Sequence, residues 1–167
     1  MTEQSIMKGL NWLKSIQSED GSFGANDKND DGTATKIDQD HLNAMTAMAL
    51  LCFLGHCELQ DSPTFGPTVQ KAIKFITTDK PDDPVTTMRG SYSHPIRTYA
   101  LCEAYTMTKI PKLKEYAKRA AELVVQGQNE SGGWAYNFGK GPVAHTDLSV
   151  AGSVSYTHLT LPTSVIV

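Results

Sequence analysis

The sequence predicts an all-α fold built from stacked helical hairpins, and three observations lead to this prediction. Apolar residues recur with helical spacing over long stretches, and no alternating strand pattern occurs before residue 154. Some of these stretches are apolar nearly all round, whereas the stretches between them are amphipathic. A motif of glutamine, glycine and an aromatic residue also recurs along the chain, which indicates internal repeats.

Composition places the chain among ordinary globular proteins. It has 167 residues, a hydrophobic fraction of 40% and a charged fraction of 20%, values that exclude a disordered or coiled-coil chain. The net charge of −3 argues against nucleic acid as a partner. No apolar run reaches the ~18 residues of a membrane span, and we identify no signal peptide. Membrane association and cellular compartment stay open, because the first residues already lie inside a repeat.

Amphipathic stretches predict outer helices, which cover the core with one face only. The clearest runs from residue 112 to residue 126, where Leu113, Tyr116, Ala117 and Ala120 form one stripe. Two further stretches, residues 6–16 and 69–76, show the same spacing.

Stretches rich in Ala, Leu and Met predict inner helices that are buried on both sides. They span residues 42–54 and 96–105, and a third begins near Asp147. Inner and outer helices alternate along the chain, so each consecutive pair forms a hairpin.

The turns between hairpins carry the repeated motif. Its members are the structural repeat residues Gln17, Gly21, Phe23, Gln128, Gly132 and Trp134, and a weaker copy ends at residues 90–92. We expect the glycines to adopt positive φ at a helix end. We also expect each glutamine amide to bond free backbone groups of a helix end, under cover of the aromatic ring.

These residues resemble the QW repeats of the terpene cyclase and protein prenyltransferase superfamily. The chain is most similar to bacterial prenyltransferase/squalene oxidase repeat proteins, which are related to squalene–hopene cyclases. The resemblance implies a partial α/α toroid over residues 1–153, with about three helical hairpins of a ring that uses about six. The missing C-terminal repeats of the same chain would then be its partner.

Residues 154–167 resemble one translated reading frame of a common sequencing adapter. We therefore expect this tail not to be native and exclude it from the fold prediction. The alternative is a native C-terminal segment with strand propensity.

The family resemblance implies a squalene cyclase-like repeat domain that binds or cyclises an apolar isoprenoid in a central cavity. If the domain is catalytic, the reaction class is that of a terpene cyclase or mutase, an isomerase. The alternative is a non-catalytic toroid that binds a protein, lipid or glycan. The resemblance implies no cofactor, and an acidic cyclase motif is not found in a matching context.

Three carboxylates are candidate catalytic acids: Asp38, Asp40 and Asp147. Each lies where an inner helix is expected to begin, so capping of the helix N-terminus is the competing interpretation. Nearby residues are candidate ligand-binding groups, because loops that enter inner helices meet on one rim of a toroid: His41, Tyr92, His94, Arg97, Tyr99 and His145. Phe53, Tyr99 and Tyr105 could line the cavity or belong to the core.

The residues that could hold a metal do not form a strong motif, and we predict no metal site. Cys52, His56 and Cys57 are close in sequence, but their spacing is not that of a zinc site, and we expect both thiols to face the core. Cys102 is expected in the core as well. Residues 27–32 resemble the start of a calcium loop, although a flexible acidic turn is the simpler interpretation.

Overall fold

The computed structural model describes residues 2–24, 38–78, 92–135 and 146–152, together with Gly32 and Val154. Five helices occupy these residues, and a short helical segment follows at residues 148–152; no strand occurs in the described ranges. The helices are α1 (Thr2–Ile16), α2 (Gln39–Gly55), α3 (Gly66–Ile76), α4 (Ser93–Thr108) and α5 (Pro111–Gln126). The all-α prediction and the order of outer and inner helices are confirmed.

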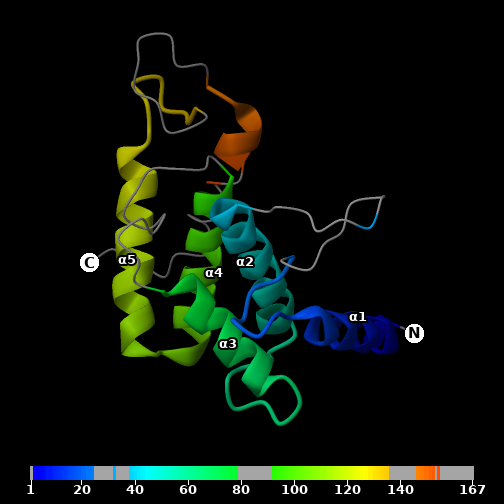
Figure 1. Ribbon diagram of the computed structural model, residues 1–167. Helices are drawn as coiled ribbons and strands as arrows, with labels where there is room; N and C mark the ends of the chain where they lie inside the picture. Colours follow the sequence, from blue (N-terminus) through cyan, green and yellow to red (C-terminus); the bar gives the residue numbers. More distant parts are fainter. Residues whose placement is uncertain are drawn as a thin grey trace.

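The helices form two layers, as expected for part of an α/α toroid. Figure 1 shows α2 and α4 side by side, with their N-terminal ends at the same upper end of the molecule. Helix α5 runs in the opposite direction along the outside of α4, and α3 packs against both α2 and α4. Each outer helix thus returns the chain to the end where the next inner helix begins.

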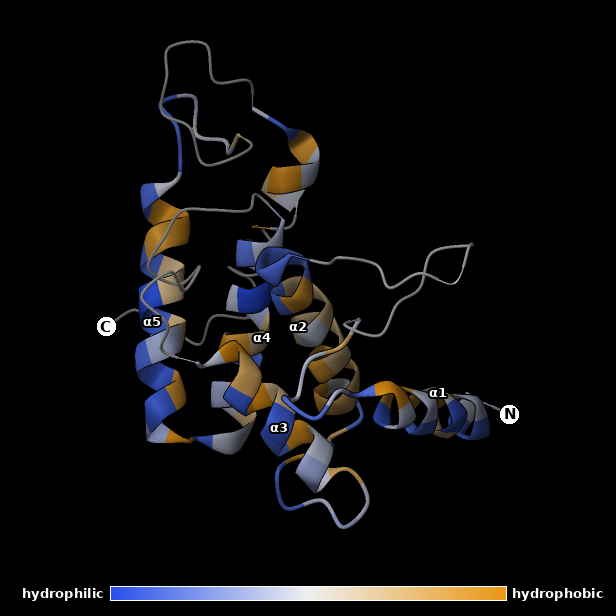
Figure 2. Cartoon of the chain, viewed as in Figure 1, coloured by the Kyte–Doolittle hydropathy of each residue, from blue (hydrophilic) through white to orange (hydrophobic). Residues whose placement is uncertain are grey.

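Small apolar side chains allow the two inner helices to pack closely. Ala47 and Leu50 of α2 and Ala100 and Leu101 of α4 are all fully buried. Figure 2 shows the contrast between layers: α2 is apolar along most of its length, whereas α5 alternates polar and apolar bands. Burial of such side chains supplies the main stabilising term of the fold.

Helix α1 projects from this body and buries little of its surface (Figure 1). Leu10 is its one buried residue, and Trp12 is 61% exposed. Polar contacts fix its carboxyl end to the next hairpin, because Lys14 Nζ donates to the Thr64 carbonyl at 2.9 Å. Its amino end contacts α2 through Glu3 and His56.

The two glutamine–glycine turns have the same backbone hydrogen bonds. In the first, the Gly21 N–H donates to the Ser18 carbonyl at 3.0 Å; in the second, the Gly132 N–H donates to the Asn129 carbonyl at 2.9 Å. Both glycines have positive φ, 95° and 86°, as predicted. Phe23 is buried beside the first turn.

The glutamines act differently from the prediction. Gln17 Nε2 donates to the Gly21 carbonyl at 3.1 Å, and Gln128 Nε2 donates to the Gly132 carbonyl at 2.7 Å. Each amide therefore closes its own turn and does not cap the helix that precedes it. Gln17, unlike Gln128, also bonds a second element, because its Nε2 donates to the Thr68 carbonyl of α3 at 3.0 Å.

Other side chains bond the free carbonyls at the ends of the outer helices. The Trp134 indole Nε1 donates to the Val124 carbonyl in the last turn of α5, at 2.8 Å. Arg97 of α4 donates to the Ile76 carbonyl at the end of α3, through Nε at 2.9 Å and also through Nη2. The Ile76 carbonyl lies at the buried end of α3, where a donor from another element stabilises it. The Val124 carbonyl also accepts from the Gly127 N–H at 3.2 Å, so the indole adds a second hydrogen bond there.

The two turn glycines allow a matched test of this packing. A Cβ at Gly21 would overlap the Lys71 backbone of α3, whereas a Cβ at Gly132 would meet nothing within 4 Å. We expect Gly132→Ala to lower the free energy of unfolding by about 1–2 kcal/mol, through positive φ alone. Gly21→Ala should cost more, roughly 3 kcal/mol or above, because backbone must also move. Urea unfolding measures the free energy of unfolding of both variants. Equal losses would contradict the close approach of Gly21 to the Lys71 backbone.

His56 joins the end of α2 to the start of α1. Its Nε2 lies 3.0 Å from Glu3 Oε1 and its Nδ1 lies 3.3 Å from Glu58 Oε1. The Glu3 contact, more than that with Glu58, raises the pKa of His56 above its ordinary value. Because both ring nitrogens face carboxylates, the doubly protonated ring fits this position best.

This raised pKa predicts a pH-dependent stability. The contribution of His56 is complete below the unfolded pKa of ~6.5 and is lost as the pH rises through the higher folded value. We expect His56→Gln to lower the melting temperature more at pH 5.5 than at pH 8.5. Thermal unfolding of the unsubstituted chain and of His56→Gln at the two pH values measures this difference. An equal drop in melting temperature at both pH values would contradict the contacts of His56 with Glu3 and Glu58.

Candidate functional site

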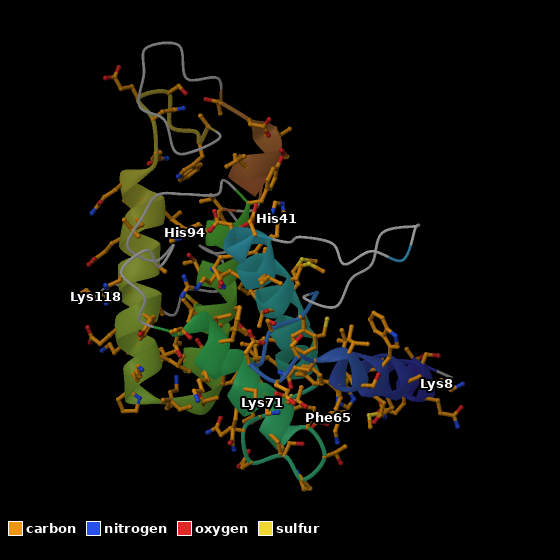
Figure 3. All side chains as sticks on the ribbon, viewed as in Figure 1. Lys8, His41, Phe65, Lys71, His94 and Lys118 are labelled. Carbon is orange, nitrogen blue, oxygen red and sulfur yellow. The ribbon has the colours of Figure 1, made fainter. Side chains whose placement is uncertain are left out.

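The N-terminal ends of the inner helices form a polar rim, and Asp38 caps the first of them. Asp38 Oδ1 accepts a hydrogen bond from the His41 backbone N–H at 2.9 Å, and it lies 2.7 Å from the His41 ring Nδ1. The backbone bond, followed by the ring contact, lowers the pKa of Asp38. Asp40 lies in the first turn of α2. Figure 3 shows His41 at this upper end of the molecule.

Asp147 caps the N-terminal end of the helical segment at residues 148–152 in the same way. Its Oδ1 accepts from the Ser149 N–H at 2.8 Å and from the Val150 N–H at 3.3 Å, and also from the Ser149 hydroxyl. The Ser149 hydroxyl in turn contacts the Tyr92 hydroxyl at the start of α4. The structure thus brings Tyr92 and Asp147 together through one serine.

His94 and Arg97 lie beneath the rim and not on it, which corrects their predicted place. His94 is fully buried, with its Nε2 3.0 Å from the Ala120 carbonyl of α5 (Figure 3). Arg97 is 2% exposed and bonds the end of α3, as described above. Both residues follow the N-terminus of α4 on the side that faces the outer layer, so they connect the two layers.

Each inner helix carries a stripe that is exposed on α2 and partly exposed on α4, and we call these two stripes the inner face. On α2 it carries Met45, Met48 and Cys52, at helical spacing; Met48 is 55% exposed. Alignment of Ala49–Leu50 with Ala100–Leu101 gives these residues the same repeat positions as Ile96, Tyr99 and Glu103 of α4. All three residues on α4 are partly exposed, although α2, α3 and α5 pack around this helix. Within the described part of the chain, the inner face is thus more exposed on α2 than on α4, where Ile96 packs against the core.

Of the three aromatic residues that were candidates to line a cavity, one lies on the inner face. Tyr99 lies on it. Phe53 is fully buried in the core, with its ring centroid 5.4 Å from that of Phe65. Tyr105 is partly buried against the core, and Lys109 Nζ lies 5.4 Å from its ring centroid.

The prediction of core-facing thiols is wrong for two of the three cysteines. Cys52 and Cys57 are exposed: Cys52 lies on the inner face, and Cys57 follows the end of α2 with φ of 60°. Cys102 is buried as expected, and burial, followed by the charge of Glu103, raises the pKa of its thiol to about 12. In the described part of the chain, no group of three His, Cys, Asp or Glu side chains is arranged to hold a metal ion.

Sequence reasoning missed Met45, Met48 and Glu103 as residues of the inner face. The sequence contains the signal for these positions, because aligning the two inner helices by their Ala–Leu pairs shows that the three α2 residues and the three α4 residues occupy the same repeat positions. The predicted binding residue His145, the acidic residues 27–31 and the weak repeat at residues 90–91 lie outside the described residues. Of the tail, the structure describes Val154, which is buried with Val150 and Trp134.

The capping role of Asp38 predicts a specific pattern of substitution effects. Asparagine caps helices as well as aspartate does, so we expect Asp38→Asn to change the free energy of unfolding by only a few tenths of a kcal/mol. Asp38→Ala should cost about 1 kcal/mol. Urea unfolding at neutral pH distinguishes the two; an equal loss for both variants would show that the charge, and not the cap, stabilises this end.

No helix of the described residues has the length and hydropathy needed to cross a membrane. No curated protein and no solved structure matches the chain. The family of the squalene-hopene cyclase C-terminal domain matches residues 1–161, which is nearly the whole chain. The helical fold, with inner and outer layers, agrees with this match. The chain belongs to the squalene-hopene cyclase C-terminal domain family and is a cyclase-like repeat domain.

Proposed function

We propose that the inner face binds the apolar chain of an isoprenoid. The observation that carries this proposal is the exposure of Met45 and Met48 on α2, at positions that correspond to the partly exposed Ile96 and Tyr99 of α4. Large apolar side chains that are exposed one turn apart on a buried helix are typical of a ligand surface.

The side chains of the stripe suit a long and flexible ligand. Methionine is unbranched and polarisable, so Met45 and Met48 can adapt to an irregular hydrocarbon chain. Tyr99 adds a rigid ring with one polar end. Family membership supports the same ligand class, since the family is named for an enzyme that acts on squalene, an isoprenoid hydrocarbon.

We propose binding, and not proton donation, for the rim. A cyclase begins with transfer of a proton from a carboxylic acid to an alkene, which requires a protonated acid. Asp38 and Asp147 both accept hydrogen bonds from helix N–H groups, and the pKa of Asp38 is lowered. These contacts favour the ionised carboxylates, so we assign neither residue as the proton donor.

A binding module for a protein, lipid or glycan is the second candidate. The polar rim favours it, because Asp38, His41 and Tyr92 present exposed polar groups at one end of the inner helices. A polar partner would contact this rim, whereas an isoprenoid chain would contact the stripe below it.

The neutral probe farnesyl methyl ether tests the proposed function. Met48→Gln places an amide on the inner face, and Val125→Gln is a matched control on α5, since Val125 is 56% exposed. Burying an unpaired amide against a hydrocarbon is unfavourable, so we expect Met48→Gln to weaken binding roughly fivefold or more. Val125→Gln should bind as the unsubstituted chain does.

Isothermal titration measures these affinities, with circular dichroism to check that both variants fold. Equal affinity of the three proteins, or no binding by any of them, would contradict an isoprenoid site on the inner face.

A further inference from the structure

The two exposed methionines of α2 differ from the other described methionines in their access to solvent. Met48 is 55% exposed, and Met45, one turn before it, is 37% exposed. Met7 of α1 and Met107 of α4 are partly buried, and both pack against the core cluster. Among the described methionines, Met48 is therefore the one most open to a reagent in solution.

Exposure of a methionine matters because its thioether is a target of two-electron oxidants such as hydrogen peroxide. The sulfur atom attacks one peroxide oxygen, so an S–O bond forms as the O–O bond breaks. The sulfur loses two electrons to the peroxide, and the hydroxide that leaves takes the proton of the transferred oxygen to become water. The product, methionine sulfoxide, is polar where the thioether was apolar.

We propose that Met48 is a site of reversible oxidation, and that its sulfoxide prevents the inner face from binding the isoprenoid chain. The inference rests on the proposed function and names a means of regulating the same site. A sulfoxide oxygen accepts hydrogen bonds, so its burial against a hydrocarbon chain without a donor is unfavourable. Methionine sulfoxide reductases restore the thioether, which makes the change reversible.

The position of Met48 lets its oxidation change the surface and leave the fold intact. Its side chain lies on the exposed side of α2, whereas the packing of this helix rests on buried residues such as Leu50 and Phe53. Cys52 of the same stripe is exposed as well, so its oxidation has to be separated from that of Met48. Cys102 is protected, because it is fully buried and the pKa of its thiol is raised to about 12.

The first measurement is the rate of sulfoxide formation at each methionine in hydrogen peroxide, by peptide mass spectrometry of the folded chain. We expect Met48 to oxidise roughly fivefold faster than Met7 and Met107, since oxidation follows exposure. In urea, where every side chain is exposed, the rates should become equal. Equal rates in the folded chain would overturn the assignment of Met48, whatever the affinity of the inner face for a ligand.

The second measurement is the affinity for farnesyl methyl ether before and after peroxide, by isothermal titration, at a dose that converts Met48 and leaves Met7 intact. The proteins are the unsubstituted chain, Met48→Leu and the control Met7→Leu, in which the same change is made on α1. The two affinities of one protein are compared as a ratio, so the affinity of a variant before oxidation does not enter.

We expect peroxide to weaken binding roughly fivefold in the unsubstituted chain and in Met7→Leu, and by less than about twofold in Met48→Leu. Treatment of the oxidised chain with a methionine sulfoxide reductase and dithiothreitol should restore its affinity.

The outcomes separate this inference from the proposed function. If the ether binds equally well before and after Met48 is oxidised, regulation by Met48 is overturned and the apolar site stands. A loss of the same size in Met48→Leu would assign the effect to another group, such as Cys52, and would also overturn the inference. If the unoxidised chain does not bind the ether, the proposed function and its regulation both fail, since the sulfoxide then has no site to control.

Discussion

The free carbonyl groups at the carboxyl ends of the outer helices impose the constraint on which the rest of the structure depends. These ends lie against the inner layer, where water is excluded, so donors from neighbouring elements contribute to their hydrogen bonding. Arg97 supplies one to α3 and Trp134 supplies one to α5. Because each donor comes from residues that follow the helix in sequence, the contacts fix how α3 and α5 meet the next inner segment.

This constraint determines which side of α4 remains open. His94 and Arg97 point toward the outer layer, where they bond α5 and α3, and the small residues Ala100 and Ala104 are buried. Ile96, Tyr99 and Glu103 then occupy a partly exposed side of α4, on which Ile96 still packs against the core. The corresponding side of α2 is more exposed at Met45 and Met48, so the candidate site is carried mainly by α2.

The fold could be predicted from the sequence because its signals are local and repeated. The alternation of amphipathic and apolar stretches gave both layers, and the glycines of the two turns have the predicted positive φ. The site was less accessible to such reasoning. The sequence predicts His94 and Arg97 on the rim because loops that enter inner helices meet there, whereas their partners in the structure are backbone carbonyls of the outer helices. Cys52 is predicted in the core because its spacing from Cys57 does not fit a zinc site, but α2 is apolar nearly all round and composition alone does not tell which apolar side is covered.

The most direct test of the account is a methyl NMR titration with chain labelled at the methionine methyl groups. The inner face carries Met45 and Met48, whereas Met7 lies on α1 against the core cluster and so serves as an internal reference. On addition of farnesyl methyl ether, we predict saturable shifts of the Met45 and Met48 methyl signals and little change at Met7. Shifts of equal size at all three methyl groups, or none at Met45 and Met48, would contradict a ligand site on the inner face.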